Sequence, residues 1–430
     1  MKKVLIITYY WPPSGGAGVQ RWLKFSKYLP LSGFEPVILT VDPKYAAYPA
    51  IDNSLEKEIP ESIRVYRTKA RDWFRFYGGD KTKIPSAGFA TNRDDSVKGK
   101  ISRFIRGNFF IPDPRRGWNK YAYKMARELI VKEGINHIIT TSPPHSTQLI
   151  GLRLKMNSPG IFWMADLRDP WTDIYYYEMF YPTFISRKID KLYERKVLQN
   201  ADIITTIGPS LAKYFESKIG RAMEKIQIVH NGYDENDFEN VERSAPDRFI
   251  LSYTGTISDL YPLDGFINAL KDVTGKGIDL FLKFTGYISD VQKEKLVKAI
   301  GRERLEFNQY ADHKTVIRQM LSSSMQLLVL AKGPGNSSFL PGKLFEYIAA
   351  GKPVLCLGPA AGDSSKILEE GGFGKCFDYD DTTGISGFLT MNIKKENAEF
   401  KTPPLEFSRK NLAIKIASLL ERSSLIHQAL

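Results

Sequence analysis

The chain has 430 residues, of which 43% are hydrophobic and 25% charged, and its formal net charge is +13. This length exceeds what one hydrophobic core usually supports, so the composition predicts two globular domains and excludes a disordered chain. The chain has two cysteines without paired spacings, which excludes a disulfide framework and predicts a reduced, cytoplasmic protein. Its five histidines are scattered, so no metal site is predicted. No apolar run is long enough for a membrane-spanning helix.

Short apolar runs alternate with helical patterns through the first half of the chain. The first run, Val4–Thr8, leads into a loop rich in Pro and Gly, which is typical of a buried parallel strand rather than of a signal peptide. A helix is predicted from Gly18 to Leu31. Further strands are predicted at Pro36–Thr40, Ile135–Thr140, Ile161–Ala165 and Ala201–Ile207. This order predicts a doubly wound α/β domain over residues 1–235.

The segment Lys69–Arg116 carries more than half of the net charge, with twelve Lys or Arg residues against five Asp residues. Within it, Ile101, Phe104, Ile105 and Phe109 follow helical spacing. A basic helix with an apolar face is typical of peripheral contact with an anionic membrane surface, here the inner face of the plasma membrane. The equally weighted alternative is a helix that packs its apolar face on the domain. Nucleic acid is the least favoured partner.

Two loops in this half are candidate sites. Gly15 and Gly16 open the first predicted helix, where free amides favour an anion such as a diphosphate, although the spacing is not that of the dinucleotide fingerprint. The run Asp166–Asp173 follows a predicted strand and places carboxylates, Arg168 and an aromatic ring where open α/β sheets keep their sites. A capped helix with a local salt bridge is the alternative. His145, after another strand, is a candidate acceptor contact or base.

A second series of predicted strands begins at Phe249–Tyr253. It continues through Leu280–Phe284, Leu305–Phe307, Met325–Leu330 and Pro353–Leu357. These strands predict a second Rossmann-like domain over residues 249–402, joined to the first by the polar stretch Asp234–Arg248. Residues 403–430 begin at a Pro-Pro pair and contain a helix with one apolar stripe. We expect this helix to cross back onto the first domain, with local packing as the alternative.

The most informative stretch runs from Gly333 to Leu355. A glycine-rich loop leads into a short helix that Gly351 ends before a buried strand. Amides at the helix start and Lys343 are predicted to hold a diphosphate, and Glu346 to accept hydrogen bonds from ribose hydroxyls. A P-loop is excluded, because Ser337 stands where its first glycine is required and Leu344 replaces the hydroxyl that binds Mg²⁺.

The sequence motifs of the two halves, in their order along the chain, resemble those of the retaining glycosyltransferases of family 4, which have the two-domain GT-B fold. The likeness covers nearly the whole chain. It is carried by the Gly15-Gly16 loop, Asp166–Trp171, Val229–Tyr233, Tyr253–Thr256, Pro341–Val354 and Leu357-Gly358.

The resemblance implies a nucleotide sugar, without a cofactor or metal, held mainly by the second domain. Glu346 matches the ribose-binding glutamate of the family's Glu-x7-Glu pair. Phe339 and Leu340 would offer amides to the diphosphate, Tyr310 would lie near the base, and Gly16 would approach the phosphates. Asp169, with Arg168 and Asp166, would face the reacting centre. The acceptor would be a saccharide, lipid-linked or part of an envelope polysaccharide, lying between the domains.

Two positions depart from the family pattern. Ser338 stands where the first glutamate of the pair is usual, and Thr256–Tyr261 replaces a stretch that commonly holds an Arg and a Lys for the diphosphate. Either another cation neutralises the leaving group, with Lys343 and Arg21 as the candidates, or donor binding is weaker than in the family. A nucleotide-sugar epimerase of the same architecture and a non-catalytic scaffold that binds sugar nucleotides are the competing hypotheses.

Overall fold

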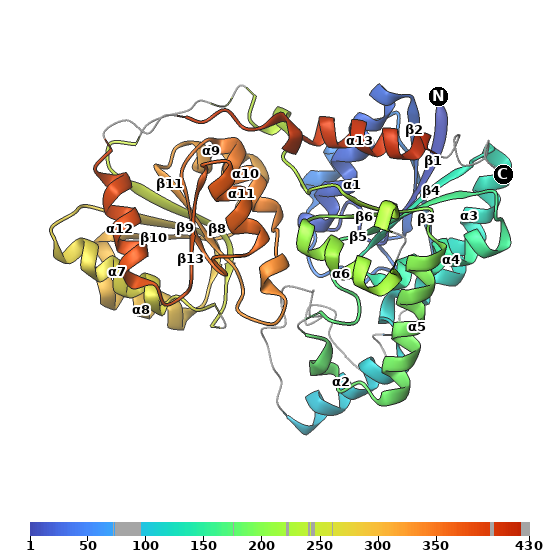
Figure 1. The fold of residues 1–430 in the computed structure, drawn as a ribbon, viewed down its shortest axis with the longest axis horizontal. Helices are drawn as coiled ribbons and strands as arrows, with labels where there is room; N and C mark the ends of the chain where they lie inside the picture. Colours follow the sequence, from blue (N-terminus) through green and yellow to red (C-terminus); the bar gives the residue numbers. More distant parts are fainter. Residues whose placement is uncertain are drawn as a thin grey trace. The chain divides into compact units, whose positions relative to one another are not determined.

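The computed structural model describes residues 1–71, 73, 96–174, 176–220, 223–239, 241, 246–259, 261–395 and 400–422. These residues form two compact units. One contains Met1–His230 together with the chain from Arg409 onward, and the other contains Asn231–Ser408. Figure 1 shows a separate parallel sheet in each unit. The aromatic residues Phe74, Phe76, Tyr77 and Phe89 of the basic segment lie outside the described residues.

The first unit is built on a seven-stranded parallel sheet in the order β3-β2-β1-β4-β5-β6-β7. Its strands are β1 (Lys2–Ile7), β2 (Phe34–Val41), β3 (Arg64–Thr68), β4 (His137–Ser142), β5 (Phe162–Leu167), β6 (Ile203–Thr206) and β7 (Ile226–Ile228). Its helices are α1 (Ala17–Tyr28), α2 (Val97–Phe109), α3 (Asn119–Glu133), α4 (Gln148–Asn157), α5 (Phe184–Asn200), α6 (Pro209–Ile219) and α13 (Arg409–Glu421).

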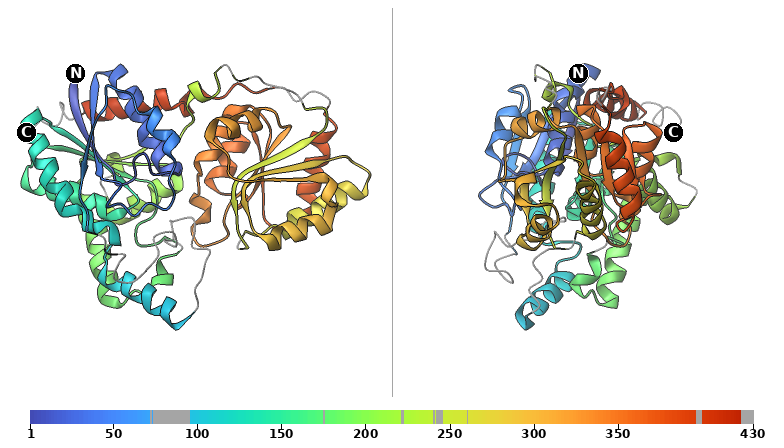
Figure 2. Two further views of the ribbon diagram at one scale, coloured as in Figure 1. Left: turned by 180° about the vertical axis from the view of Figure 1, so that it is seen from behind. Right: turned by 90° about the vertical axis from the view of Figure 1, so that its left-hand side faces the viewer.

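The strand order reverses between β1 and β4. Parallel crossovers are right-handed, so the reversal places α1 on one face of the sheet and the row α3, α4, α5 and α6 on the other. Figure 2 shows the sheet between these helices. The predicted doubly wound α/β layout is therefore confirmed. Loops at the carboxyl ends of β1 and β4 flank a topological switch point, which is where such sheets bind ligands.

The terminal helix α13 belongs to the first unit. Its stripe of Leu412, Ile416 and Leu420 is buried in the same hydrophobic cluster as Trp22 and Phe25 of α1. The return of the chain to the first domain is thus confirmed, and the alternative of local packing is wrong. Burial of this apolar stripe decides the outcome, because a helix of this length is marginal without tertiary packing.

The second unit has a six-stranded parallel sheet in the order β10-β9-β8-β11-β12-β13. The strands are β8 (Ile250–Ile257), β9 (Phe281–Ile288), β10 (Leu305–Asn308), β11 (Met325–Val329), β12 (Val354–Leu357) and β13 (Gly374–Phe377). The helices are α7 (Asp264–Gly275), α8 (Asp290–Ile300), α9 (His313–Leu321), α10 (Gly342–Ala350), α11 (Asp363–Glu370) and α12 (Thr382–Ile393). The switch point lies between β8 and β11.

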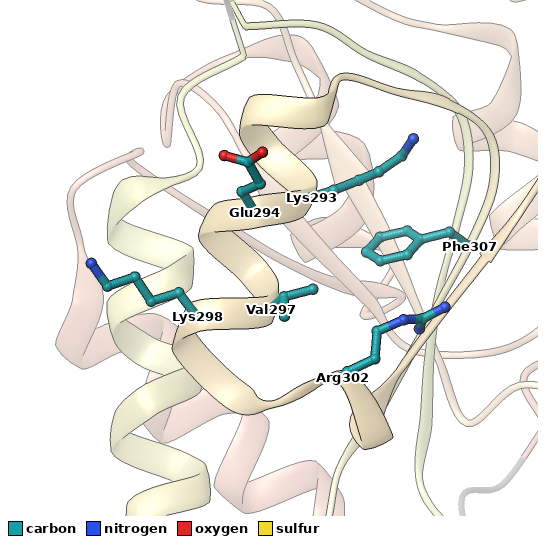
Figure 3. A pocket seen from close by; sticks show the side chains of 6 residues that line it. All are labelled: Lys293, Glu294, Val297, Lys298, Arg302 and Phe307. Carbon is teal, nitrogen blue, oxygen red and sulfur yellow. The ribbon is translucent and has the colours of Figure 1, made fainter.

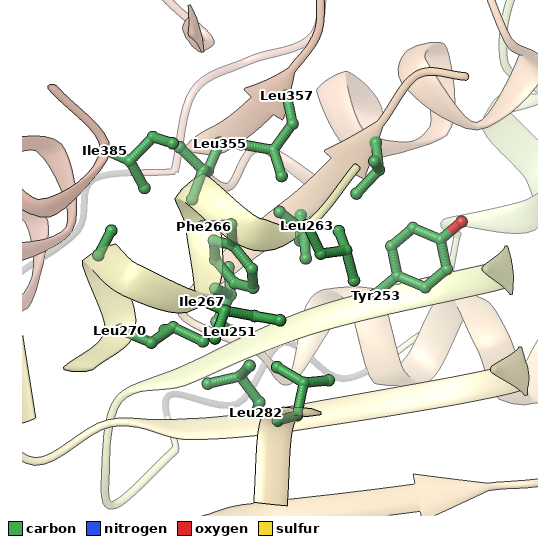
Figure 4. Close-up of a cluster of buried hydrophobic side chains, with 14 of the residues drawn as sticks. Leu251, Tyr253, Leu263, Phe266, Ile267, Leu270, Leu282, Leu355, Leu357 and Ile385 are labelled. Atoms are coloured by element: carbon green, nitrogen blue, oxygen red, sulfur yellow. The ribbon is translucent and has the colours of Figure 1, made fainter. Parts of the chain in front are cut away.

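A large apolar core holds the second sheet to its helices. Figure 4 shows Leu251 and Leu282 from the sheet packed near Phe266 and Leu270 of α7. The two cysteines, Cys356 and Cys376, are both free, buried and directly opposite each other on β12 and β13. This core fixes the strand ends from which the candidate donor site is built.

Candidate functional site

Helix α10 starts beside the switch point of the second sheet. Pro341 is its N-cap residue, and no side chain caps the helix start. The first amides of a helix have no intrahelical partner, so the start of α10 offers donors and a positive dipole end to an anion. The hydroxyl of Tyr347 accepts a hydrogen bond from the Thr254 amide at 3.2 Å and so ties α10 to the end of β8.

Lys343, in the first turn of α10, turns toward the carboxyl end of β8. Its Nζ donates to the Tyr253 hydroxyl at 3.0 Å and to the Thr254 carbonyl at 3.3 Å, and it lies 4.1 Å from the centre of the Tyr253 ring. Burial lowers the pKa of Lys343 to about 7, although Cys356 and Glu346 act in the opposite direction. The amine is therefore poised to gain a full charge when an anion approaches.

Gly255 borders this amine and follows Thr254 on β8. Its φ is 125°, a conformation that side chains rarely adopt, and a Cβ there would lie 3.4 Å from the Lys343 Nζ. Lys343 of α10 therefore brings an amine beside Gly255, and the stretch that follows Gly255, Thr256–Tyr261, contains no Lys or Arg.

Glu346 lies one turn along α10 from Lys343 and is half-buried. Within the described part of the chain, no hydrogen bond or salt bridge reaches its carboxylate. A half-buried carboxylate without such a partner retains its capacity to accept hydrogen bonds from hydroxyl groups. This geometry fits the predicted role toward ribose.

The loop before α10 offers fewer open amides than predicted. The Phe339 amide donates to the Asn336 carbonyl at 3.1 Å, so it is occupied within the loop, and the Phe339 carbonyl accepts from Ser364. The Leu340 amide has no hydrogen-bond partner among the residues described, while its side chain is buried. Ser338 donates to the Gly335 carbonyl at 2.7 Å. The expectation of a free amide therefore stands for Leu340 and is wrong for Phe339.

Tyr310 lies in the loop after the edge strand β10, and 78% of it is exposed. The second unit also has an open pocket of about 520 Å³ over α8 and β10, which Figure 3 shows. None of the predicted site residues lines it; its lining residues are Lys293, Glu294, Val297, Lys298, Arg302 and Phe307. We assign no role to this pocket, because α8 and the body of β10 lie away from the carboxyl ends of the strands.

In the first unit, the Gly15-Gly16 loop leaves the start of α1 open. Gly16 has a φ of 102° and caps α1 without a side-chain hydrogen bond, whereas the Gly15 amide donates to the Ala50 carbonyl. The Arg168 guanidinium lies against this start, since a Cβ on Gly18 would come within 3.0 Å of its Nη1. Arg168 also donates to the Ser142 carbonyl at 3.0 Å. A cation and open helix amides thus meet at the first switch point.

Asp166 is an internal anchor rather than a surface group. Its side chain is fully buried and accepts from Trp22, Thr141, Thr205 and twice from Arg21, whose Nη2 lies 2.9 Å away. Burial raises its pKa, but the charge and hydrogen bonds of Arg21 outweigh burial and lower it.

Arg21 is equally enclosed. It is 1% exposed, and its Nη1 donates to the His230 carbonyl at 2.7 Å. Asp166 was predicted to contact the reacting centre, and Arg21 to contact the diphosphate. Both predictions of direct contact are wrong, because both side chains are buried. The two side chains satisfy each other inside the domain.

Asp169 and His145 lie near the same sheet edge. Asp169 is half-buried, and burial raises its pKa against the opposing charge of Arg168. His145 stacks on Trp171 with ring centres 4.9 Å apart, and burial lowers its pKa to about 3. The imidazole is thus neutral at physiological pH and too weakly basic for efficient proton transfer.

Comparison with known proteins gives a partial sequence match and full-length structural matches. No family model matches the chain. Over 177 residues it is 29% identical to TuaH of Bacillus subtilis strain 168, assigned as a teichuronic acid biosynthesis glycosyltransferase; the match covers 39% of this chain and 43% of TuaH. The chain therefore matches less than half the length of that relative.

Solved structures match along the whole chain. A glycosyltransferase from Rickettsia africae ESF-5 has a TM-score of 0.63 at 14% identity and covers 98% of this chain and 99% of its own. A UDP-N-acetylglucosamine 2-epimerase has a TM-score of 0.53 at 12% identity and covers 100% and 97%. At such identities the likeness establishes the fold alone, and it confirms the predicted GT-B fold of two Rossmann-like domains.

Proposed function

We propose that this protein is a retaining glycosyltransferase of family 4 that transfers a sugar, of the hexose type, from a nucleotide donor to a saccharide acceptor. The observation that carries the proposal is the start of α10, where Lys343, an uncapped helix end and the half-buried Glu346 lie together at a switch point. The GT-B fold and the partial match to TuaH support the same activity.

The donor is proposed to bind with its diphosphate at the Leu340 amide and the α10 start, and its ribose at Glu346. Tyr310 is proposed to lie near the base. Lys343 is the cation that meets the leaving diphosphate in place of the Arg and Lys missing after Gly255. Arg168, Asp169 and Gly16 of the first unit are proposed to serve the reacting centre and the phosphates, with His145 as a neutral packing group.

The acceptor is proposed to be a lipid-linked or envelope polysaccharide precursor that the enzyme meets on the cytoplasmic side of a membrane. The basic segment Lys69–Arg116 and the role named for TuaH support this class of acceptor. No helix in the part of the chain that the structure describes has both the length and the apolarity to span a bilayer.

The proposed reaction keeps the anomeric configuration and needs no divalent ion. The acceptor hydroxyl oxygen bonds to the anomeric carbon from the face on which the bond to the diphosphate breaks, and its proton passes to the departing diphosphate, whose charge Lys343 and helix amides stabilise. Transfer activity is expected to persist in excess chelator. Activity that appears only when Mg²⁺ or Mn²⁺ is added would contradict this mechanism.

The donor site is tested by Glu346→Ala. Loss of hydrogen bonds to ribose is expected to weaken nucleotide binding by about 1–3 kcal/mol, which is roughly a 5- to 150-fold rise in Kd. Isothermal titration with UDP, GDP and ADP measures the effect and identifies the base. Glu370→Gln, an exposed glutamate on α11, is the matched control and should bind as the unaltered protein does.

A nucleotide-sugar epimerase is the second candidate, because an epimerase is among the structural neighbours. An epimerase changes the configuration of the donor sugar without any acceptor, whereas a transferase leaves the configuration of unreacted donor unchanged. Product analysis by NMR after incubation with the donor alone separates the two. A scaffold that only binds sugar nucleotides would give neither epimerised donor nor transfer to an added acceptor.

A further inference from the structure

Most of the apolar side chains of α2 face solvent instead of the protein core, and Ile105 is half-buried. Val97 is 74% exposed, Ile101 53%, Phe104 42% and Phe109 69%. The alternative in which α2 buries its apolar face on the domain is therefore wrong for these residues. Large exposed apolar side chains in a row mark an interaction surface rather than ordinary surface scatter.

Helix α2 is nevertheless firmly attached to its unit through other residues. The backbone packs closely at Gly107, where a Cβ would come 2.3 Å from the Phe180 carbonyl oxygen, and the Arg106 guanidinium stacks 3.9 Å from the centre of the Phe180 ring. Asn108 donates to the Tyr181 carbonyl at 3.0 Å. These contacts hold α2 on its unit through other residues, and they leave its apolar face exposed.

The exposed stripe continues onto the start of α5. Asn108 shares a helical face with Val97, Ile101 and Phe104, because these residues follow the spacing i, i+4, i+7 and i+11. Its side-chain oxygen accepts from the Thr183 amide at 2.7 Å and the Ser186 hydroxyl at 2.9 Å.

Phe184 and Ile185 lie between Thr183 and Ser186 in the chain and are 79% and 70% exposed. Asn108 thus joins the apolar stripe of α2 to a second apolar pair. We call Val97, Ile101, Phe104, Phe184 and Ile185 the α2–α5 surface.

Positive charge surrounds the α2–α5 surface. Residues 96–110 contain four Lys or Arg residues and no acidic residue. Lys98 and Lys100 lie on opposite sides of the apolar stripe and are exposed. On α5, Lys188 and Lys191 are exposed as well, and the nearby Glu178 is already paired with Arg187.

We propose that the α2–α5 surface inserts into the interface of an anionic lipid bilayer, with the adjacent Phe184 and Ile185 as its anchors on α5. This inference rests on the proposed function and names the surface through which the enzyme reaches its acceptor. Apolar groups flanked by lysines match acyl chains below anionic headgroups. Nucleic acid fits less well, because Val97, Ile101 and Ile185 offer no ring for base stacking.

The test is flotation of the full-length protein with vesicles of phosphatidylcholine, with and without phosphatidylglycerol. The unaltered protein should float with the anionic vesicles. Phe184→Ser/Ile185→Ser should lower partition by roughly tenfold or more, because two large apolar side chains lose their burial. Lys98→Glu/Lys100→Glu should abolish the preference for anionic vesicles while leaving the apolar anchors in place.

Val131→Ser is the matched control, since Val131 is 83% exposed on α3 away from this surface, and it should float normally. Unchanged flotation of the Phe184→Ser/Ile185→Ser variant would overturn the proposal, as would equal binding to neutral vesicles. Retention of single-stranded RNA by the unaltered protein, lost in that variant, would assign the surface to nucleic acid instead. Nucleotide titration of the same variants reports on the donor site separately, so failure of one proposal is distinguishable from failure of the other.

Discussion

Replacing Lys343 by methionine is expected to lower kcat/KM for sugar transfer by roughly 100- to 1,000-fold, the usual cost of removing one group that stabilises developing negative charge. Methionine keeps the length and apolar contacts of the side chain, so the helix start should remain intact. Lys366→Met on α11, an exposed lysine of the same unit, should have no effect. Equal activity of the two variants in a steady-state transfer assay would remove Lys343 from the mechanism.

Lys343 also gives donor binding a pH dependence. Its pKa is lowered to about 7, so the free amine is charged at pH 6 and mostly neutral at pH 8. Binding of an anionic donor takes up a proton at the higher pH, and affinity should fall by about tenfold between these two values. A nucleotide sugar is the right probe, because its diphosphate does not titrate in this range. The slope should disappear in Lys343→Met, and a slope that persists would assign it to another group.

Asp166→Asn is expected to reduce the free energy of unfolding by about 3–5 kcal/mol, because it leaves the Arg21 charge buried without its partner. Urea denaturation near neutral pH measures the loss. Asp173→Asn is the control: this carboxylate is 56% exposed and pairs with Lys218, so its loss should cost less than about 1 kcal/mol. A loss at Asp166 no larger than at Asp173 would contradict the buried network.

The acid dependence supplies a second check on Asp166. Its pKa is lowered in the folded protein, so its stabilisation is complete above the ordinary carboxyl pKa of about 3.9 and disappears only as pH falls through the folded value. The difference in stability between the unaltered protein and Asp166→Asn should therefore shrink in strong acid. A difference that grows in acid would show that the carboxylate is not the stabilising group.

Most of the fold was predictable because buried parallel strands are continuous apolar runs. The strands β1, β2, β4, β5, β6, β8, β9, β11 and β12 each overlap such a run, whereas the predicted edge strand β10 reads Leu-Glu-Phe-Asn. The strands that were missed, β3, β7 and β13, all lie at the edge of a sheet. Edge strands are covered less completely, so β3 reads Arg-Val-Tyr-Arg-Thr and carries too weak an apolar signal.

The site was predictable only in part. The sequence located the loops, because glycines and a helix start have local signatures, but it assigned cationic roles equally to Arg21 and Lys343. It included Tyr253 and Thr254 in a motif that carries the resemblance but assigned no contact to them or to Gly18. A glycine in the first turn of α1 was the one available signal for the approach of Arg168.

Sequence by itself determined the two α/β domains, the position of the candidate loops and the amphipathic character of α2, since each depends on residues near one another along the chain. The tertiary structure decided which charged side chains pair with each other inside the fold and which stay accessible to a ligand. Arg21 meets Asp166 across 145 positions, and Lys343 meets Tyr253 across 90. Burial and pairing arise from such distant contacts, and no local pattern encodes them.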